Sequence, residues 1–335
     1  MRVAVFGAYG HTGRFVVAEL RERGYEPLPL GRDVGKLAAA FPEGEHRVAS
    51  VDDPGSLDRA LAGAAAVVNC AGPFASTAGP LIEAALRAGI PYVDVAAEIE
   101  ANRDTFAHYA ERAEAAGVAV VPAMAFFGGL GDLLVTAAMG DWTAADEAHV
   151  AYGLSSWHPT AGTVASGVVS RERRDGRRIR FTGGRLVYAD GDLPRLDWEF
   201  PAPLGVRPVL GEFTMADVVT VPSHLDIPEV CTYMTADAAR DLAAGDAPAA
   251  VDEHGRSAQT FTVDVVVRAG DVRRRMVAQG QDIYAVTAPL AVEATHRVLT
   301  GRTRVKGVAS AGRIFDAPDF LRALSDHVTV RSAAV

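Results

Sequence analysis

The stretch "GAYGHTGR", Gly7–Arg14, directly follows the apolar run "MRVAVF" and precedes "FVVAELRERG". An apolar run of this length indicates a buried strand, and the segment after the turn has the periodicity of an amphipathic helix. The first N–H groups of a helix have no internal partner and lie at the positive end of its dipole, so a glycine turn between a strand and a helix binds anions well. The sequence therefore predicts that a nucleotide phosphate binds at this turn.

The three glycines of this turn have separate expected roles. Gly7 permits the sharp turn, Gly10 lacks the Cβ that would block a pyrophosphate, and Gly13 lets the helix pack close to the strand. Their spacing is G-x-x-G-x-x-G, which differs from the more familiar G-x-G-x-x-G, and either form is informative only between a strand and a helix. The alternative is a tight structural turn that binds nothing.

Strand-like and helix-like segments alternate over the first third of the chain. The expected strands are RVAVFG, YEPLPLG, HRVASVD, AAVVNCAG, PYVDVA and VAVVPAM, and a helical pattern follows each of the earlier ones. Such alternation gives a parallel, doubly wound sheet, and this number of strands matches the dinucleotide-binding (Rossmann) form of the fold. Beyond Gly128 the strands become longer and more alternating, which predicts a second domain with a mostly antiparallel sheet. The expected fold class is α/β with an added α+β domain.

The end of the second strand indicates which dinucleotide binds. An NAD site has an acidic residue there for the ribose 2′-hydroxyl, whereas this strand ends in "LPLGRD" with Gly31 and Arg32, and Lys36 follows one turn later. An arginine in this place can bind a 2′-phosphate through two parallel hydrogen bonds. We therefore expect NADP(H) rather than NAD(H), with Asp33 capping the next helix. The alternative for Arg32 is an ordinary solvated loop cation.

The segment "VVNCAGPF" ends the fourth strand. Ligands of doubly wound sheets bind beyond the carboxyl ends of the strands, where the strand order reverses, so the residues after this strand are expected to line the cofactor. These residues are Asn69, Ala71, Gly72 and Pro73. Cys70 has no base beside it in the sequence and is expected to be a small buried hydrophobic side chain. Asp52, which ends the third strand, either accepts from the adenine amine or caps the following helix.

Composition and charge narrow the classes of partner. The chain has 335 residues, 49% of them hydrophobic, and 33 Lys and Arg against 42 Asp and Glu, for a formal net charge of -9. This acidic balance disfavours nucleic acid or an anionic membrane as a partner, and the apolar stretches are too short to span a bilayer. Cys70 and Cys231 lie far apart, without metal-ligand spacing. We therefore expect free thiols, no metal and a cytoplasmic protein, since the start of the chain lacks the features of a signal peptide.

Several stretches together resemble the NADP-binding saccharopine dehydrogenase-like oxidoreductases. The stretches that carry the resemblance are GAYGHTGR, LGRDVGKL, VVNCAGPF, YVDVAAE, GGLGDLL, GTVASGV, GQDIYAVTAP and GVASAGRIFDAPDFLRAL. The resemblance implies a Rossmann NADP-binding domain formed by residues 1–133 and 285–335. By the same resemblance, an α+β domain over residues 134–284 would interrupt it, bind the substrate and make homodimer contacts.

The resemblance also implies which residues touch the cofactor. Gly7, Gly10, Gly13 and Arg14 would hold the pyrophosphate, and Arg32 would meet the 2′-phosphate. The stretch Asn69–Phe74 would flank the ribose and the nicotinamide. The predicted cofactor site is completed by residues of the turn and of the stretch after the fourth strand: Tyr9, His11, Thr12 and Phe74.

Hydride transfer needs a group that supplies or stabilises a proton near the nicotinamide. Neither a Tyr-x-x-x-Lys pair after the fourth strand nor zinc-ligand spacing stands out, which disfavours the short-chain and zinc dehydrogenase mechanisms. The candidate proton donors are Tyr284, His158 and Tyr152, and the alternative for the tyrosines is a role as packing anchors. Asp94 and Glu98 are expected to cap helices, with Glu98 also a candidate for binding a substrate amine.

The sequence therefore predicts an NADPH-dependent reductase that transfers hydride to a small organic substrate, at a C=N bond or an activated C=C bond, in specialised metabolism. Two alternatives stay open: a carbonyl reductase or dehydrogenase on the same fold, and an NADPH-binding sensor or partner protein without catalysis. The charge run Arg171–Arg178 is expected to be a solvated face, and the alternative is a surface for an acidic substrate or carrier partner.

Overall fold

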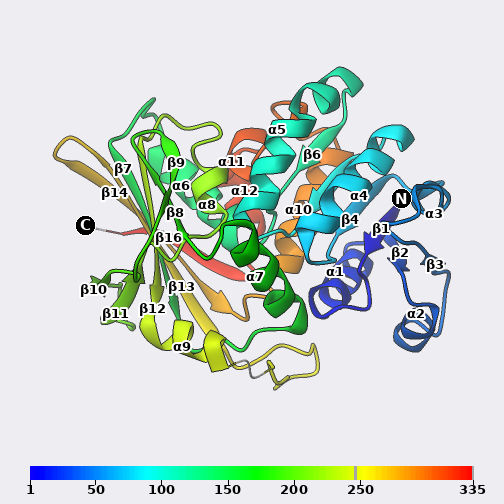
Figure 1. Ribbon diagram of the computed structural model, residues 1–335, viewed down its shortest axis with the longest axis horizontal. Coiled ribbons are helices and arrows are strands. Elements are labelled where there is room, and N and C mark those ends of the chain that lie inside the picture. Colours follow the sequence, from blue (N-terminus) through cyan, green and yellow to red (C-terminus); the bar gives the residue numbers. More distant parts are fainter. Residues whose placement is uncertain (245–246, 334–335) are drawn as a thin grey trace.

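Two β-sheets, with helices between and around them, make up the computed structural model, which describes residues 1–244 and 247–333 (Figure 1). The first sheet is parallel, with the strand order β15-β6-β5-β4-β1-β2-β3. Its strands are β1 (Arg2–Phe6), β2 (Glu26–Gly31), β3 (Arg47–Val48), β4 (Ala66–Asn69), β5 (Tyr92–Asp94), β6 (Ala119–Val121) and β15 (Gly307–Val308). The order reverses between β1 and β4, which places the loops after these two strands where doubly wound sheets bind ligands. The predicted parallel sheet is confirmed, and β15 adds a seventh strand to it.

Helices cover both faces of the first sheet. The helices that connect its strands are α1 (His11–Glu22), α2 (Val34–Ala40), α3 (Pro54–Leu61), α4 (Phe74–Ala88) and α5 (Ile99–Ala116). Because side chains alternate along a strand, Val3 and Val5 face a core shared with α1, whereas Ala4 and Phe6 face a core shared with α3 and α4. Burial on both faces explains why β1 is a continuous apolar run in the sequence.

The second sheet is mixed and mostly antiparallel, as predicted. Its strands are β7 (Glu147–Leu154), β8 (Arg178–Thr182), β9 (Arg185–Ala189), β10 (Arg195–Glu199), β11 (Val206–Gly211), β12 (Glu229–Thr235), β13 (Thr260–Ala269), β14 (Val272–Gln281) and β16 (Val328–Ala333). Its main path runs β10-β11-β12-β7-β13-β14-β16, with β8 paired to β12 and β9 paired to β8. β7 and β12 are parallel neighbours, whereas β13 and β14 form the antiparallel hairpin that the sequence predicts.

The other helical segments lie between the two sheets or beside the second one (Figure 1). They are the turn η1 (Phe126–Leu130), in which Phe127 and Gly128 have non-helical backbone angles, and the helices α6 (Gly131–Met139), α7 (Ala161–Arg173), α8 (Asp217–Thr220), α9 (Ala236–Ala244), α10 (Thr287–Leu299), α11 (Ala311–Ile314) and α12 (Ala317–Ala323). α6 packs on β13 and β14, whereas α10 packs on α1. Their buried side chains join the cores of the two sheets into one continuous cluster. Within the described residues, none of the helices has the length and the apolar character to cross a membrane.

The end of the chain departs from the predicted domain division. α10 and β15 return to the first sheet as expected, but β16 pairs with β14 of the second sheet, with Arg331 opposite Val277. Without β16, the outer backbone N–H and C=O groups of β14 would form an open edge. The stretch "VTVRSA" is rich in strand-forming residues and covers that edge. The domain boundaries at residues 133 and 284 stay a prediction.

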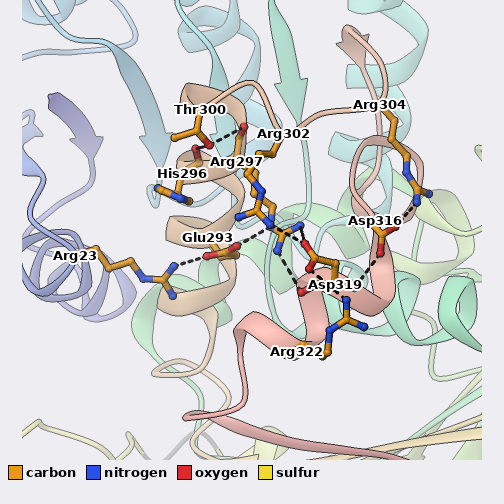
Figure 2. A network of polar contacts seen from close by, with 10 residues as sticks. All are labelled: Arg23, Glu293, His296, Arg297, Thr300, Arg302, Arg304, Asp316, Asp319 and Arg322. Carbon is orange, nitrogen blue, oxygen red and sulfur yellow. Dashed lines mark hydrogen bonds and ion pairs between the residues drawn. The ribbon is translucent and has the colours of Figure 1, made fainter.

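A buried network of ion pairs joins α10 to α1 and α12 (Figure 2). The Arg297 side chain is 2% exposed, and its guanidinium contacts Glu293 at 2.6 Å (Nε to Oε1) and Asp319 at 2.9 Å (Nη1 to Oδ2). Arg23 of α1 pairs with the other carboxylate oxygen of Glu293. The Arg297 guanidinium also lies 4.8 Å from the ring centre of Phe320. The network thus ties the last helices of the chain to the helix that begins at the glycine turn.

Candidate active site

The glycine-rich turn has the geometry of a phosphate cradle. Gly7 has a φ of +80°, and a Cβ on it would lie 2.8 Å from the Cβ of Ala71 in the loop after β4. A Cβ on Gly13 would collide with the carbonyl oxygen of Gly7, so the close approach of α1 to β1 requires glycine at this position. Gly10 is the N-cap of α1 and offers no side chain to the first helical N–H groups. Those N–H groups stay available to an anion.

The turn opens into a cavity of about 1280 Å³ between the two sheets. Pockets for one small ligand measure roughly 300–1000 Å³, so this cavity has room for a dinucleotide and a second molecule. Its wall on the first sheet contains most of the predicted cofactor residues: Gly7, Tyr9, Gly10, His11, Thr12, Arg32, Asp52, Ala71, Gly72, Pro73 and Phe74. Its opposite wall contains Thr163 of the stretch GTVASGV and residues outside the quoted motifs: Phe126, Phe127, Trp157, Thr160, Glu212 and Phe213.

The end of β2 fits the 2′-phosphate of NADP(H). Arg32 is exposed, lines the cavity and makes no ion pair within the described residues. The ring of Tyr9 packs over Gly31, and the Lys36 ammonium lies 6.0 Å from the centre of that ring. Asp33 accepts from the N–H of Lys36 at 2.9 Å, which confirms the expected cap of α2. Two cations therefore lie at the strand end where an NAD site has a carboxylate.

Four predicted cofactor residues lie outside the cavity wall: Gly13, Arg14, Lys36 and Asn69. Asn69 is fully buried, and its Oδ1 accepts from the N–H of Ala71 at 3.0 Å, which shapes the loop that lines the cavity. Arg14 donates from Nε to the carbonyl oxygen of Tyr9 at 3.1 Å, which braces the turn. These side chains hold the backbone of the site, and their direct contact with the cofactor stays a prediction.

The helix-capping roles that the sequence predicts for the acidic residues are only partly confirmed. Asp52 lines the cavity, but the alternative that it caps α3 is wrong, because Asp53 is the N-cap whose side chain accepts a helical N–H. Glu98 does cap a helix, but the helix is α4: its two carboxylate oxygens accept from the N–H groups of Phe74 at 2.7 Å and Ala75 at 3.0 Å. These two bonds use about half of the lone-pair sites of the carboxylate. Glu98 also lines the cavity, so its binding of a substrate amine stays a prediction.

Cys70 and Asp94 lie at the ends of the neighbouring strands β4 and β5, and Cys70 is half-buried and lines the cavity, whereas Asp94 is buried. Burial raises the pKa of the Cys70 thiol well above its ordinary value, so Cys70 is no thiolate nucleophile and behaves as the expected apolar side chain. Asp94 caps no helix, contrary to expectation. Its Oδ1 accepts from the backbone N–H groups of Ala96 at 3.0 Å and Ala123 at 2.8 Å, and burial raises its pKa to about 6. Asp94 therefore ties the loop after β5 to the loop after β6.

His11 brings an unpartnered nitrogen to the edge of the cavity. Its Nε2 is buried and has no hydrogen-bond partner among the described residues. The ring packs edge-on against Phe15 and Tyr284, each at 5.3 Å between ring centres, and burial lowers the pKa of His11. A buried nitrogen without a hydrogen-bond partner lowers the stability of the fold. A polar cofactor bound beside the turn would supply that partner. The glycine cradle, Arg32 and this nitrogen all fit bound NADP(H).

Of the three predicted proton donors, Tyr284 lines the cavity. Its hydroxyl oxygen accepts from Trp157 Nε1 at 3.2 Å and from the N–H of Thr160 at 3.3 Å, and it lies 2.9 Å from Thr163 Oγ1. Because two N–H groups occupy its lone pairs, the Tyr284 proton is directed to Thr163. Tyr284 is therefore held by the segment that leads into α7.

Tyr152 and His158 do not line the cavity. Tyr152 is fully buried and donates to the carboxylate of Asp217, at 2.9 and 2.8 Å from its two oxygens. Alternation along β7 turns the ring into the core, against Phe126 and Phe127. His158 is half-buried, and its Nδ1 has no partner among the described residues. The prediction that Tyr152 donates a proton to the substrate is therefore wrong, and His158 is not placed to do so.

The Tyr152–Asp217 pair makes the stability depend on pH. Burial raises the pKa of Asp217 to about 7, and the nearby Asp132 acts in the same direction. An unfolded aspartate has a pKa of about 3.9, so between about pH 4 and pH 7 the folded chain binds more protons and loses up to about 1.4 kcal/mol of stability per pH unit as the pH rises. Asp217→Asn removes this titration. Urea unfolding at pH 5, 6 and 7 should show the wild type losing stability relative to the variant, and a constant difference would contradict the assignment.

Comparisons with known proteins agree with the geometry of the first sheet. A family model described as the saccharopine dehydrogenase NADP binding domain matches residues 3–121. A probable mitochondrial saccharopine dehydrogenase-like oxidoreductase of Arabidopsis thaliana is 30% identical in an alignment of 142 residues that covers 37% of this chain and 31% of that protein. Saccharopine dehydrogenase-like oxidoreductases of Bos taurus and Homo sapiens are each 30% identical in alignments of 145 residues that cover 37% of this chain and 34% of those proteins. The chain thus spans about a third of the length of these curated relatives.

A solved structure matches over the whole chain. Apo saccharopine dehydrogenase (L-Glu forming) from Saccharomyces cerevisiae has a TM-score of 0.66 and 11% sequence identity, and the match covers 99% of this chain and 100% of that chain. At this identity the match shows the fold, and it confirms the pairing of a Rossmann sheet with a second, mixed sheet. Residues 3–121 therefore match the saccharopine dehydrogenase NADP-binding domain, which supports NADP(H) as the cofactor, and the chain as a whole has the fold of saccharopine dehydrogenase.

Proposed function

We propose that this protein is an NADPH-dependent oxidoreductase that reduces a small organic substrate at a C=N bond or an activated C=C bond. One observation carries the proposal: a single cavity of about 1280 Å³ joins the glycine-rich turn to Tyr284 and to an aromatic wall. The NADP-binding family model covers the side of the cavity formed by the first sheet. Relatives named as oxidoreductases are 30% identical to this chain over 37% of its length.

The residues of the first sheet hold and orient the cofactor, which supplies the hydride when bound. The available N–H groups at the start of α1 bind the pyrophosphate, and Arg32 binds the 2′-phosphate. The loop Ala71–Phe74, at the carboxyl end of β4, orients the nicotinamide. Phe127 and Trp157, whose ring centres are 5.1 Å apart, keep water from the reacting end of the cavity.

Tyr284 is the proposed proton donor. Two N–H groups, from Trp157 and Thr160, already point at its oxygen. They stabilise the negative charge that develops on that oxygen as the proton leaves. The Tyr284 hydroxyl lies 2.9 Å from Thr163 Oγ1, and a substrate atom that takes the place of Thr163 Oγ1 would receive the proton during the reaction.

Tyr284→Phe is expected to lower kcat by about 100-fold, since a positioned general acid is typically worth about 10²- to 10⁴-fold. The affinity for NADPH should not change, because the hydroxyl faces Trp157 and Thr163 and lies outside the cradle. Loss of NADPH absorbance measures turnover, and calorimetry measures binding. Tyr109→Phe, a half-buried tyrosine outside the cavity, is the matched control. Turnover equal to that of the wild type would make Tyr284 a packing anchor.

The reaction class is tested by calorimetric titration with NADPH and NADH, followed by a panel of imines, enoyl compounds and ketones. Oxidation of NADPH by an imine or an enoyl compound supports the proposal. Oxidation by ketones alone favours the carbonyl reductase alternative, and binding without oxidation favours the non-catalytic one. If neither nucleotide binds, the proposal fails at its first step.

We also propose a homodimer in a reducing compartment such as the cytoplasm. Cys70 and Cys231 are both free thiols, which suits such a compartment. Leu196 of β10 and Val206 of β11 are 39% and 56% exposed on strands at one edge of the second sheet. A second chain commonly covers an edge of this kind. Sedimentation at several concentrations should give the mass of a dimer, and a monomer at all of them would contradict the proposal.

A further inference from the structure

Helix α7 forms one long side of the cavity, and residues along its whole length line it. The start of α7 contacts Tyr284 through Thr160 and Thr163. Its other end carries Arg171, and Arg174 follows as the C-cap. At a rise of about 1.5 Å per residue, Arg171 and Arg174 lie about 12–16 Å along the helix axis from Thr163. α7 therefore separates the proposed reacting end of the cavity from a second, basic end.

The middle of α7 is apolar and exposed. Val164 and Val168 line the cavity and are 47% and 51% exposed. Together with Arg171 they occupy helix positions i, i+4 and i+7, which lie on one face. Apolar residues at this spacing normally face a protein core, whereas this row faces an open cavity. The row is therefore suited to the apolar part of a ligand.

The lining at the basic end of the cavity contains more arginines than acids, and one of these arginines, Arg177, lies 3.4 Å from Asp175. The lining contains the arginines Arg171, Arg174, Arg177 and Arg178 and the acids Asp192 and Glu212. Arg178 pairs with Glu212, and Arg174 lies 3.5 Å from the buried carboxylate of Glu100. Arg171 is exposed and makes no ion pair within the described residues. The structure therefore differs from the expected solvated face, because these arginines converge on a cavity.

Two guanidinium N–H groups at this end lack a partner. The Nε atoms of Arg174 and Arg178 are buried and have no hydrogen-bond partner among the described residues. Guanidinium groups bind the oxygens of carboxylates and phosphates through parallel N–H bonds. An anionic group at the end of a ligand would satisfy these donors and meet the unpaired charge of Arg171.

We infer that the substrate is an elongated anion with an apolar body. Its reducible group lies at Tyr284, its apolar body lies along Val164 and Val168 over about 12–16 Å, and its carboxylate or phosphate lies among the arginines. One part of the inference, that the substrate reacts at Tyr284, rests on the proposed function. The anion site at the end of α7 rests on the arginines alone.

Decanoate is a suitable probe, because it joins a carboxylate to an extended apolar chain. It is titrated by calorimetry into the protein saturated with NADPH, beside methyl decanoate, butyrate and decyl phosphate, all below micelle-forming concentrations. Decanoate should bind about ten-fold or more tightly than its neutral ester, and affinity should fall about three- to four-fold for each methylene removed towards butyrate. Comparison with decyl phosphate shows which anion the site prefers. Equal affinity for decanoate and methyl decanoate would overturn the inference.

Substitutions of the arginines test where the anionic group binds. Arg171→Gln breaks no ion pair among the described residues, so it should fold, and it should weaken decanoate about ten-fold. Adding Arg174→Gln should weaken it further, with NADPH affinity unchanged. Arg185→Gln removes an exposed arginine of β9 outside the cavity and should behave as the wild type. Weaker NADPH binding in the Arg171 variant would assign the arginine to the cofactor and overturn the inference. The protein could instead bind decanoate through Arg171 and bind no NADPH. That result would contradict the proposed function and leave the anion site standing.

Discussion

Replacement of Arg297 by alanine is expected to lower the free energy of unfolding by about 3–5 kcal/mol, which is the usual effect of removing one partner of a buried ion pair. The Arg297 side chain is 2% exposed and Glu293 is 5% exposed, so their pair is almost entirely shielded from water. Removal of the guanidinium leaves the Glu293 carboxylate with Arg23 alone and opens a cavity against Phe320. Both effects destabilise the contact between α10, α1 and α12.

The matched control lies in the same part of the fold (Figure 2). Arg304 pairs with Asp316, and both side chains are about half exposed, at 54% and 48%. Arg304→Ala should therefore cost less than about 1 kcal/mol. The double variant Glu293→Leu/Arg297→Met should recover most of the lost stability, since apolar residues replace both charges. Urea unfolding of the four proteins measures these differences, and equal losses in Arg297→Ala and Arg304→Ala would contradict the role of burial.

Arg32→Glu is expected to weaken NADPH by about 100-fold, because a charge-assisted hydrogen bond is worth about 1.5–3 kcal/mol and the reversed charge also repels the 2′-phosphate. NADH has no 2′-phosphate, so its affinity should change little. Arg32 is exposed at the end of β2 and lines the cavity, so the substitution leaves the core intact. Calorimetric titration of the variant with both nucleotides measures the effect.

Arg21→Glu is the control for Arg32→Glu. Arg21 lies in the last turn of α1, away from the cavity, and is exposed. Its replacement changes the net charge by the same amount, so any general electrostatic effect on nucleotide binding appears in both variants. A similar loss of NADPH and NADH affinity in Arg32→Glu would show that Arg32 has no specific contact with the 2′-phosphate.

The cofactor side of the cavity could be predicted because its signals are local. The turn at Gly7, the close packing at Gly13 and the cation at Arg32 each depend on residues within a few positions of one another. Asp33 caps α2 through an N–H three residues away, which is again a short-range feature. Where the local signals compete, as at Asp52 and Asp53, the backbone position of the helix start decides which acid becomes the cap.

The substrate side could not be predicted in the same way. Tyr152 and Tyr284 both come from strand ends or loops near the junction of the two sheets, and the sequence makes both of them candidate proton donors. The side of β7 on which Tyr152 lies decides between them, since it directs that ring to Asp217 and the core. The arginines at the end of α7 form a charge run that is typical of a solvated face, and only the packing of α7 beside the cavity makes them part of its wall.

The sequence by itself determined the alternation of strands and helices, the phosphate cradle and the preference for NADP(H). These features follow from residues that are neighbours along one strand, turn or helix. Tertiary structure alone decided which polar groups face the cavity, and it placed β16 in the second sheet. Tyr152 meets Asp217 across 65 residues and Trp157 meets Tyr284 across 127 residues. Contacts over such separations depend on how whole elements pack, and no periodicity or short motif encodes that.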